Sequence, residues 1–212
     1  NGFHNTIIDE SGRVEDPGFV SDYREWFEEH KQGRMGYRDH SVGWNSWMAR
    51  PSHLPEWLHA TSWTADEAIG FLKRRDPNKP FFLKVSFARP HSPYDPPQVY
   101  YDMYRDADLP EPVVGDWAGM NLDAKEAQKT DAWRGARSNR ETKRAKAAYY
   151  ASITHVDHQI GKLFYEMKKA GLYDDTVIMF VSDHGDMLGD HYLWRKTYAY
   201  EGSSHIPFIL KA

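Results

Sequence analysis

The clearest hydrophobic pattern in the chain is an unbroken apolar run from Val177 to Val181, with polar residues on both sides. Such a run is typical of a strand that is buried in a parallel sheet. Two further runs rich in β-branched and aromatic residues predict strands, one over residues 81–88 and one over residues 205–210. The chain is therefore expected to contain a sheet with at least three strands.

Helical periodicity is strongest between Ser138 and Gly171. Ser138 and Glu141 form a capping box at the start of this segment, and Gly171 is placed to end the helix. The apolar residues of this segment recur at steps of three and four, which places them in one stripe: Tyr149, Ile153, Val156, Ile160, Leu163 and Met167. Two shorter helices are predicted to begin at further capping boxes, at Asp22 and at Thr64.

The order helix, strand, long helix, strand, strand predicts an α/β fold, with a parallel sheet and flanking helices. Residues 1–62 are expected to be mostly irregular with one short helix, and residues 63–212 to form the α/β core. Residues 109–139 are rich in Pro, Gly and charge, so they are expected to make an irregular surface excursion or flap.

Composition narrows the class of protein. The 212 residues are 40% hydrophobic and 15% aromatic, which fits one domain of moderate size with a packed core. A formal net charge of −4 gives no electrostatic case for nucleic acid as the main partner. The chain contains no Cys, which excludes disulfides and thiolate chemistry within it. Because residue 1 is Asn, we expect the natural N-terminus to lie outside the sequence.

A carboxylate and an imidazole, Asp183 and His184, follow the apolar run almost directly. In open parallel sheets, ligands bind just beyond the carboxyl ends of the strands. Asp183 is a hard oxygen ligand suited to Ca²⁺, Mg²⁺ or Mn²⁺, His184 can add a nitrogen, and Gly185 permits a sharp turn. The alternative is that Asp183 caps a turn and His184 is a solvated loop residue.

Two more residues are candidates for chemistry. Lys196 carries a compact point charge suited to a tetrahedral oxyanion. His91 follows the predicted strand 81–88 in a proline-rich loop, which can hold its imidazole in a fixed geometry as a general acid or hydrogen-bond donor. The alternatives are a surface charge for Lys196 and an imidazole packed between prolines for His91.

Three neighbouring polar residues, Asp186, Asp190 and His191, are assigned supporting roles. Not all the polar side chains of this short loop can point at one ion, so these three are expected to cap turns or to support the ligands.

These blocks resemble the type I sulfatases of the alkaline phosphatase superfamily. The segment from Ser182 to Lys196 is similar to that family's strand-end metal motif and its downstream sulfate-binding lysine. The segment from Arg89 to Tyr94 resembles the block that supplies a substrate-contacting histidine. The resemblance covers most of the chain from about Trp57 onward.

The resemblance implies a metal site formed by Asp183 and His184, with calcium as the usual ion and Mn²⁺ or Mg²⁺ as alternatives. It implies that Lys196 neutralises the sulfate and that His91 assists departure of the leaving group. The family's nucleophile is a formylglycine made in a Cys-x-Pro-Ser-Arg-type motif. Residues 49–53 mimic that motif only superficially, with Ala in the first position and His in the last. Alanine cannot be a nucleophile, so this segment is interpreted as a loop and the likeness as chance. The formylglycine is therefore expected outside these 212 residues.

The resemblance further implies that residues 1–212 are a fragment of one sulfatase catalytic domain, with an incomplete alkaline-phosphatase-like sandwich. Such a fragment is expected to be inactive alone and to self-associate through exposed sheet edges. The expected substrate is a sulfated small molecule or glycan, and neither nucleic acid nor a membrane is an expected partner. The family resemblance favours a periplasmic or extracellular location.

Three alternatives stay open. A phosphonate or phosphate ester hydrolase of the same superfamily shares the Asp-His-Gly motif and the lysine, and its substrates are also tetrahedral oxyanions. A degenerate relative would keep the scaffold as a non-catalytic binding module. The third alternative is an α/β domain whose polar strand ends carry no chemistry.

Overall fold

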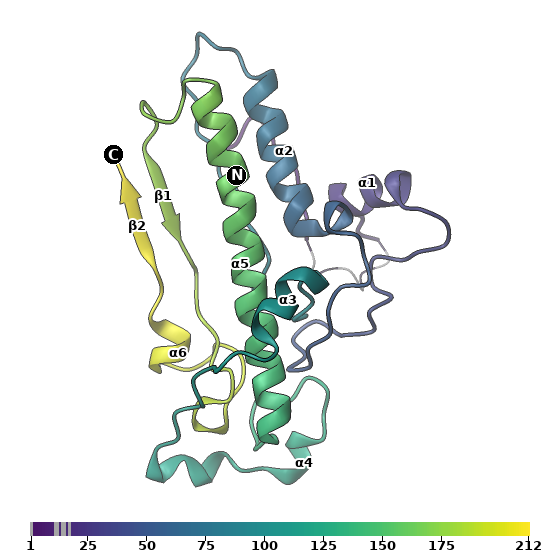
Figure 1. Cartoon of the computed structure of the whole chain (residues 1–212), viewed down its shortest axis with the longest axis vertical. Helices are drawn as coiled ribbons and strands as arrows, with labels where there is room; N and C mark the ends of the chain where they lie inside the picture. The colour runs from purple at the N-terminus through teal and green to yellow at the C-terminus, as the bar shows by residue number, and fades with distance from the viewer. Residues whose placement is uncertain (1, 11–12, 14–15, 17) are drawn as a thin grey trace.

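One long helix organises the computed structural model, which describes residues 2–10, 13, 16 and 18–212. This helix, α5 (Asn139–Lys169), has α2 (Ala60–Arg74) packed along one side and a two-stranded sheet on the other (Figure 1). The helix α3 (Gln98–Tyr104) also packs on α5. None of the helices in the described part of the chain is long and apolar enough to cross a membrane.

Shorter elements fill the remaining segments. They are α1 (Asp22–His30), η2 (Glu56–Leu58), η3 (Asp116–Asn121), α4 (Ala124–Ala127), η4 (Asp190–Tyr192) and α6 (Glu201–Ser204). The predicted excursion over residues 109–139 contains η3 and α4, and part of it is fixed against the loop that follows β1. Its backbone at residues 133–135 exchanges hydrogen bonds with residues 192–194, at 2.8 and 2.9 Å.

The ends of α5 are as predicted. The Ser138 hydroxyl accepts from the Glu141 backbone N–H while the Glu141 carboxylate accepts from the Ser138 N–H, which completes the capping box. At the other end Gly171 adopts φ +67°, and the Leu172 N–H reaches back to the Met167 carbonyl at 2.9 Å. These local hydrogen bonds satisfy backbone groups that a helix leaves free at its ends.

The predicted starts of the two shorter helices are wrong. Ser21, not Asp22, caps α1, and the Asp22 carboxylate instead accepts from the Ile8 N–H at 2.7 Å. Helix α2 begins four residues before Thr64, where Thr61, Ser62 and Trp63 are buried and the His59 ring caps the helix by accepting from the Thr61 N–H. Tertiary packing has overridden the local capping signal in this helix.

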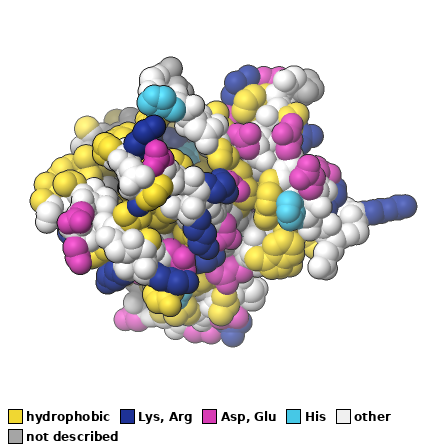
Figure 2. Space-filling model, turned by 90° about the horizontal axis from the view of Figure 1, so that it is seen from above, with side chains coloured by type: hydrophobic (Ala, Val, Ile, Leu, Met, Phe, Trp, Pro, Cys, Tyr) yellow, Lys and Arg dark blue, Asp and Glu magenta, His cyan; other side chains and the backbone are white. Residues whose placement is uncertain are grey.

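The sheet differs from the prediction in direction and burial. The strands β1 (Ile178–Val181) and β2 (Phe208–Lys211) pair antiparallel, so the parallel pairing expected here is wrong. Most of their apolar side chains are exposed, Phe208 by 64%, because no layer of the described chain covers them. Figure 2 shows hydrophobic side chains reaching the surface between charged ones.

Residues 81–88 alternate like a strand but have no ladder partner among the described residues. Phe81, Leu83 and Val85 pack toward the core between α2 and α5, while Phe82 is 79% exposed. Ile178 of β1 packs against the same core. The two extended segments therefore share one packing surface without sharing hydrogen bonds.

A separate buried cluster joins the segments that carry the candidate chemistry. It consists of Tyr94, Ala145, Ala148, Leu188 and Trp194, from the loop after residues 81–88, from α5 and from the loop after β1. Tyr94 and Trp194 are at most 2% exposed, and buried aromatic side chains of this size contribute strongly to packing. This cluster holds the two loops against the same half of α5.

Candidate active site

The structure brings His91 and Lys196 into direct contact. The Lys196 Nζ lies 2.5 Å from the His91 Nε2, although the residues are 105 positions apart in the sequence. The His91 Nδ1 lies 2.8 Å from the Ser92 carbonyl oxygen, which can only accept, so Nδ1 carries the proton. The His91 Nε2 is therefore the acceptor of the lysine hydrogen bond.

Burial sets the protonation of this pair. It lowers the pKa of His91 to about 4, and the neighbouring Lys196 charge acts in the same direction. Burial also lowers the pKa of Lys196, while the carboxylates of Asp186 and Asp183 act against that shift. At pH 7 the pair is a neutral imidazole next to an ammonium group.

His184 lies at the same place. Its ring is 6.0 Å from the His91 ring, centroid to centroid, in an edge-on arrangement. Its Nδ1 lies 2.8 Å from the Gly185 carbonyl oxygen and so carries the proton, which leaves the lone pair on Nε2. That Nε2 is 3.6 Å from the Asp183 Oδ2, and the Asp183 side chain is 87% exposed. The strand-end residues therefore converge on one region, as the sequence predicts.

The chemistry of this donor pair fits a metal ion. A metal-binding histidine usually donates its second ring N–H to a carbonyl or carboxylate, as His184 does. Asp183 and His184 supply two ligands, and the described residues contain no group of three or more side chains placed to hold an ion. Calcium takes six to eight oxygen ligands, so the two residues form only part of such a site.

Gly185 is needed for a reason that the sequence does not reveal. A Cβ atom at this position would lie 2.2 Å from the carbonyl oxygen of Gly202. The Gly185 N–H also donates to the Ser203 carbonyl at 2.8 Å. Close approach of two backbones, rather than a special turn, therefore excludes a side chain here.

The supporting roles predicted for Asp186, Asp190 and His191 are confirmed. The half-buried Asp186 accepts, through its carboxylate, from the Leu188 and Arg195 backbone N–H groups and from the Tyr94 hydroxyl. Asp190 accepts from the Val113 N–H, and His191 from the Gly115 N–H. These contacts fix the loop between β1 and Lys196.

Trp44 belongs to a loop and reaches the candidate site. Its ring stacks on the His91 ring at 4.3 Å between centroids, with 19° between the planes. Trp44 is half-buried and also lines a cavity of about 60 Å³, beside Tyr37, His40 and Arg89. The indole therefore covers one face of the imidazole.

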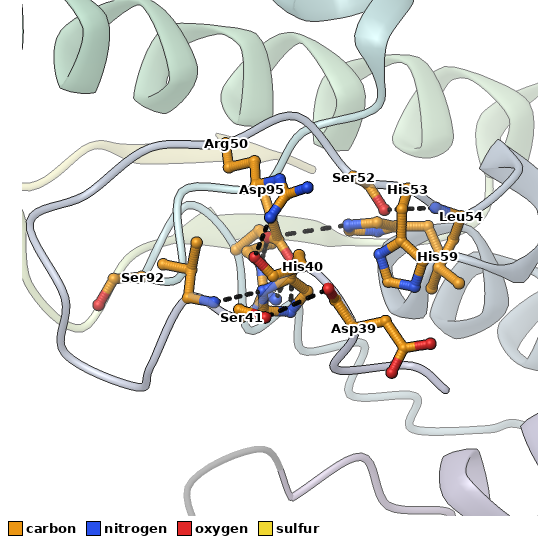
Figure 3. Close-up of polar contacts among 12 residues, drawn as sticks. Asp39, His40, Ser41, Arg50, Ser52, His53, Leu54, His59, Ser92 and Asp95 are labelled. Carbon is orange, nitrogen blue, oxygen red and sulfur yellow. Dashed lines mark hydrogen bonds and ion pairs between the residues drawn. The ribbon is translucent and has the colours of Figure 1, made fainter. Parts of the chain in front are cut away.

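Sequence reasoning missed a buried ionic cluster next to His91. The Asp95 carboxylate accepts two hydrogen bonds from Arg89, at 2.5 and 2.9 Å, and faces the Nε2 atoms of His40 and His59 at 3.6 and 3.9 Å. Figure 3 shows both imidazoles pointing toward Asp95. Burial alone would raise the pKa of Asp95, but Arg89 holds it well below its ordinary value. The only sequence signal was Arg and Asp flanking the proline-rich loop.

Comparison with known proteins shows which family the chain resembles. A sulfatase family model matches residues 16–212. An arylsulfatase of Clostridium perfringens is 50% identical over 189 residues, which cover 89% of this chain and 39% of that protein. PehA, a multifunctional alkaline phosphatase superfamily protein of Trinickia caryophylli, is 32% identical over 76% of this chain and 34% of its own length.

A solved structure shows the fold. The phosphonate monoester hydrolase of Agrobacterium radiobacter superposes with a TM-score of 0.73 at 26% identity, over 89% of this chain and 40% of that one. The predicted α/β, alkaline-phosphatase-like fold class is confirmed. The chain spans two fifths or less of the length of these three relatives. By the match over residues 16–212 and the likeness to the arylsulfatase, the chain belongs to the sulfatase family.

Proposed function

We propose that this chain supplies the anion-neutralising and leaving-group side of a sulfatase active site. The observation that carries the proposal is the contact of His91 with Lys196, which comes from a loop 105 residues further along the chain. The His184 ring lies next to that of His91. A hydrolase of sulfate esters is supported by the family match and by the arylsulfatase relative. The substrate we propose is a sulfated small molecule or glycan.

Lys196 would neutralise the sulfate oxygens. A negative group held by Lys196 would also change the state of His91, because it would draw the ammonium N–H away from the His91 Nε2. A nearby anion favours the charged imidazolium, so the pKa of His91 would rise from its low value when substrate binds. His91 could then protonate the departing oxygen.

The metal part of the proposal rests on Asp183 and His184. They would hold a divalent cation, calcium by family resemblance, together with ligands from outside these 212 residues. When bound, the cation would stabilise negative charge on the ester oxygens. By the same resemblance, the nucleophile would be a formylglycine from outside the 212 residues, which contain no Cys.

Phosphonate ester hydrolysis is the second candidate. It is favoured by the similarity to the phosphonate monoester hydrolase of Agrobacterium radiobacter. Sulfate and phosphonate esters both present tetrahedral oxyanions to a lysine, so the described residues serve either reaction.

Steady-state kinetics of the full-length protein test the proposal, with 4-nitrophenyl sulfate and a matched aryl phosphonate ester. The expected result is a higher kcat/KM for the sulfate, loss of turnover in EDTA and recovery with calcium. The 212-residue chain alone should show no turnover above buffer. A full-length protein that hydrolyses neither ester would refute the enzyme and support a binding module.

A further inference from the structure

We propose that Asp95 is a positioning residue for His91, because its pair with Arg89 joins the two ends of the loop that carries the imidazole. The inference deepens the proposed function and rests on it for the role of His91 beside the ester. The contacts that define it are internal to the chain.

The Arg89–Asp95 pair closes this loop with His91 between its ends. The guanidinium binds both carboxylate oxygens, through Nε at 2.5 Å and Nη2 at 2.9 Å. The two side chains are only 10% and 5% exposed. A bidentate pair of this kind fixes orientation as well as distance. The span of the loop is therefore fixed at a site that solvent does not screen.

Two imidazoles of matching local structure face Asp95 from neighbouring segments, with their Nε2 atoms 3.6 and 3.9 Å from its carboxylate oxygens, which is longer than a hydrogen bond. The His40 Nδ1 accepts from the Val42 N–H at 3.0 Å, and the His59 Nδ1 accepts from the Thr61 N–H at 3.2 Å. In a neutral imidazole the other nitrogen then carries the proton. Each ring therefore presents an Nε2–H to the carboxylate (Figure 3).

His40 connects this cluster to the wall of the candidate active site. It lies four residues before Trp44, the side chain stacked on His91. The Arg50 side chain also donates to the His40 carbonyl, at 3.0 Å. The His91 loop and the loop that covers it therefore meet where the His40 ring faces the Asp95 carboxylate.

The same proton positions argue against a metal at this cluster. A metal would need the lone pairs on the Nε2 atoms of His40 and His59, but those atoms carry protons while Nδ1 accepts from the backbone. Arg89 already occupies both oxygens of Asp95. The cluster is built to hold a carboxylate in place.

Stability is a weak reason for burying so many ionisable groups. Taking charges out of water costs free energy that their attraction often fails to repay, and apolar replacements are frequently as stable. A geometric role for the cluster explains its position around His91 better.

Three variants test the positioning role: Asp95→Asn, His40→Asn and His40→Gln. Asparagine keeps an acceptor in place of the His40 Nδ1 but removes the donor that faces Asp95, whereas glutamine extends a donor toward the Nε2 position. The readouts are the ¹⁵N shifts of His91, which report the Nδ1–H tautomer, and the NOE between the rings of Trp44 and His91. Both are measured at pH 7 on the chain itself.

The expected result is that the wild type and His40→Gln keep the Nδ1–H tautomer and the NOE. His40→Asn and Asp95→Asn should show mixed tautomers and an NOE at least twofold weaker. Glu56→Gln is the matched control, since Glu56 accepts from Tyr100 and Gln159 in a neighbouring polar network and makes no hydrogen bond or ion pair with the described residues 89–95. It should lower stability and leave both signals unchanged.

A folded Asp95→Asn protein with the wild-type tautomer and NOE would overturn the proposal. If Asp95→Asn does not fold, the His40 pair decides, and indistinguishable signals in His40→Asn and His40→Gln would overturn it. Because neither readout involves turnover, failure of the sulfatase proposal would remain distinguishable from failure of this one.

Discussion

At the scale of single residues, the proton on His91 decides what this side chain can do. In the structure the proton sits on Nδ1 against the Ser92 carbonyl, and Nε2 accepts from Lys196. A neutral imidazole in this state has no proton to give at Nε2. The acid role proposed for His91 therefore depends on an anion that engages Lys196 and raises the pKa of His91.

Replacing His91 by Ala in the full-length protein is expected to affect poor leaving groups most. General acid catalysis contributes roughly 10²- to 10⁴-fold, and it matters more as the departing alkoxide becomes more basic. Rates on a series of aryl sulfates with different phenol pKa values measure this. Equal losses across the series would instead assign His91 to substrate binding.

At the scale of elements, the sequence predicted what local hydrogen bonds decide. The capping box at Ser138 and the stop at Gly171 need only neighbouring residues, and both are present. The start of α2 and the direction of the β1–β2 pairing depend on distant contacts and were wrongly predicted. The convergence of His91 with the residues after β1 was predicted from strand ends, and the His91 and His184 rings do meet, although residues 81–88 pair with no strand in the described chain. The Asp95 cluster needs three segments that no local pattern connects.

The loop closed by Arg89 and Asp95 is expected to make the chain sensitive to acid. The pKa of Asp95 is depressed in the folded state, so its contribution to stability is present above the unfolded pKa of about 3.9 and is lost as the pH falls below it. Asp95→Asn should cost about 3–5 kcal/mol at pH 7, because it leaves Arg89 buried without its counter-charge. Urea unfolding at pH 7 and pH 3 measures both effects.

The control for acid sensitivity is Asp66→Asn, which removes an exposed ion pair with Lys162. It should change the free energy of unfolding by less than about 1 kcal/mol and keep the wild-type pH dependence. The account of Asp95 fails if its variant loses stability between pH 7 and pH 3 as steeply as the wild type does.

At the scale of the whole molecule, the sheet has unpaired strand edges and exposed apolar side chains. Both strands have one edge without a partner in the described chain, and Val181 and Phe208, which face each other in the ladder, are 51% and 64% exposed. Exposed edges with apolar side chains favour pairing with another chain. The chain alone is therefore expected to self-associate.

Phe208→Lys is expected to reduce this self-association, because a charge on an edge strand opposes pairing. Sedimentation velocity over a range of protein concentrations measures the change. Tyr165→Lys is a suitable control, since Tyr165 is 65% exposed and belongs to α5 rather than to either strand. A monomeric wild-type chain at all concentrations would contradict the expectation.

The most direct measurement of the central claim is kcat/KM of the full-length protein on an aryl sulfate, with and without Lys196→Ala. If Lys196 neutralises the sulfate as proposed, loss of its ammonium should lower kcat/KM by about 10²- to 10³-fold. Lys143→Ala, which removes a half-exposed lysine paired with Glu111, should leave it unchanged. Equal rates for Lys196→Ala and the wild type would contradict the claim that this chain neutralises the sulfate group.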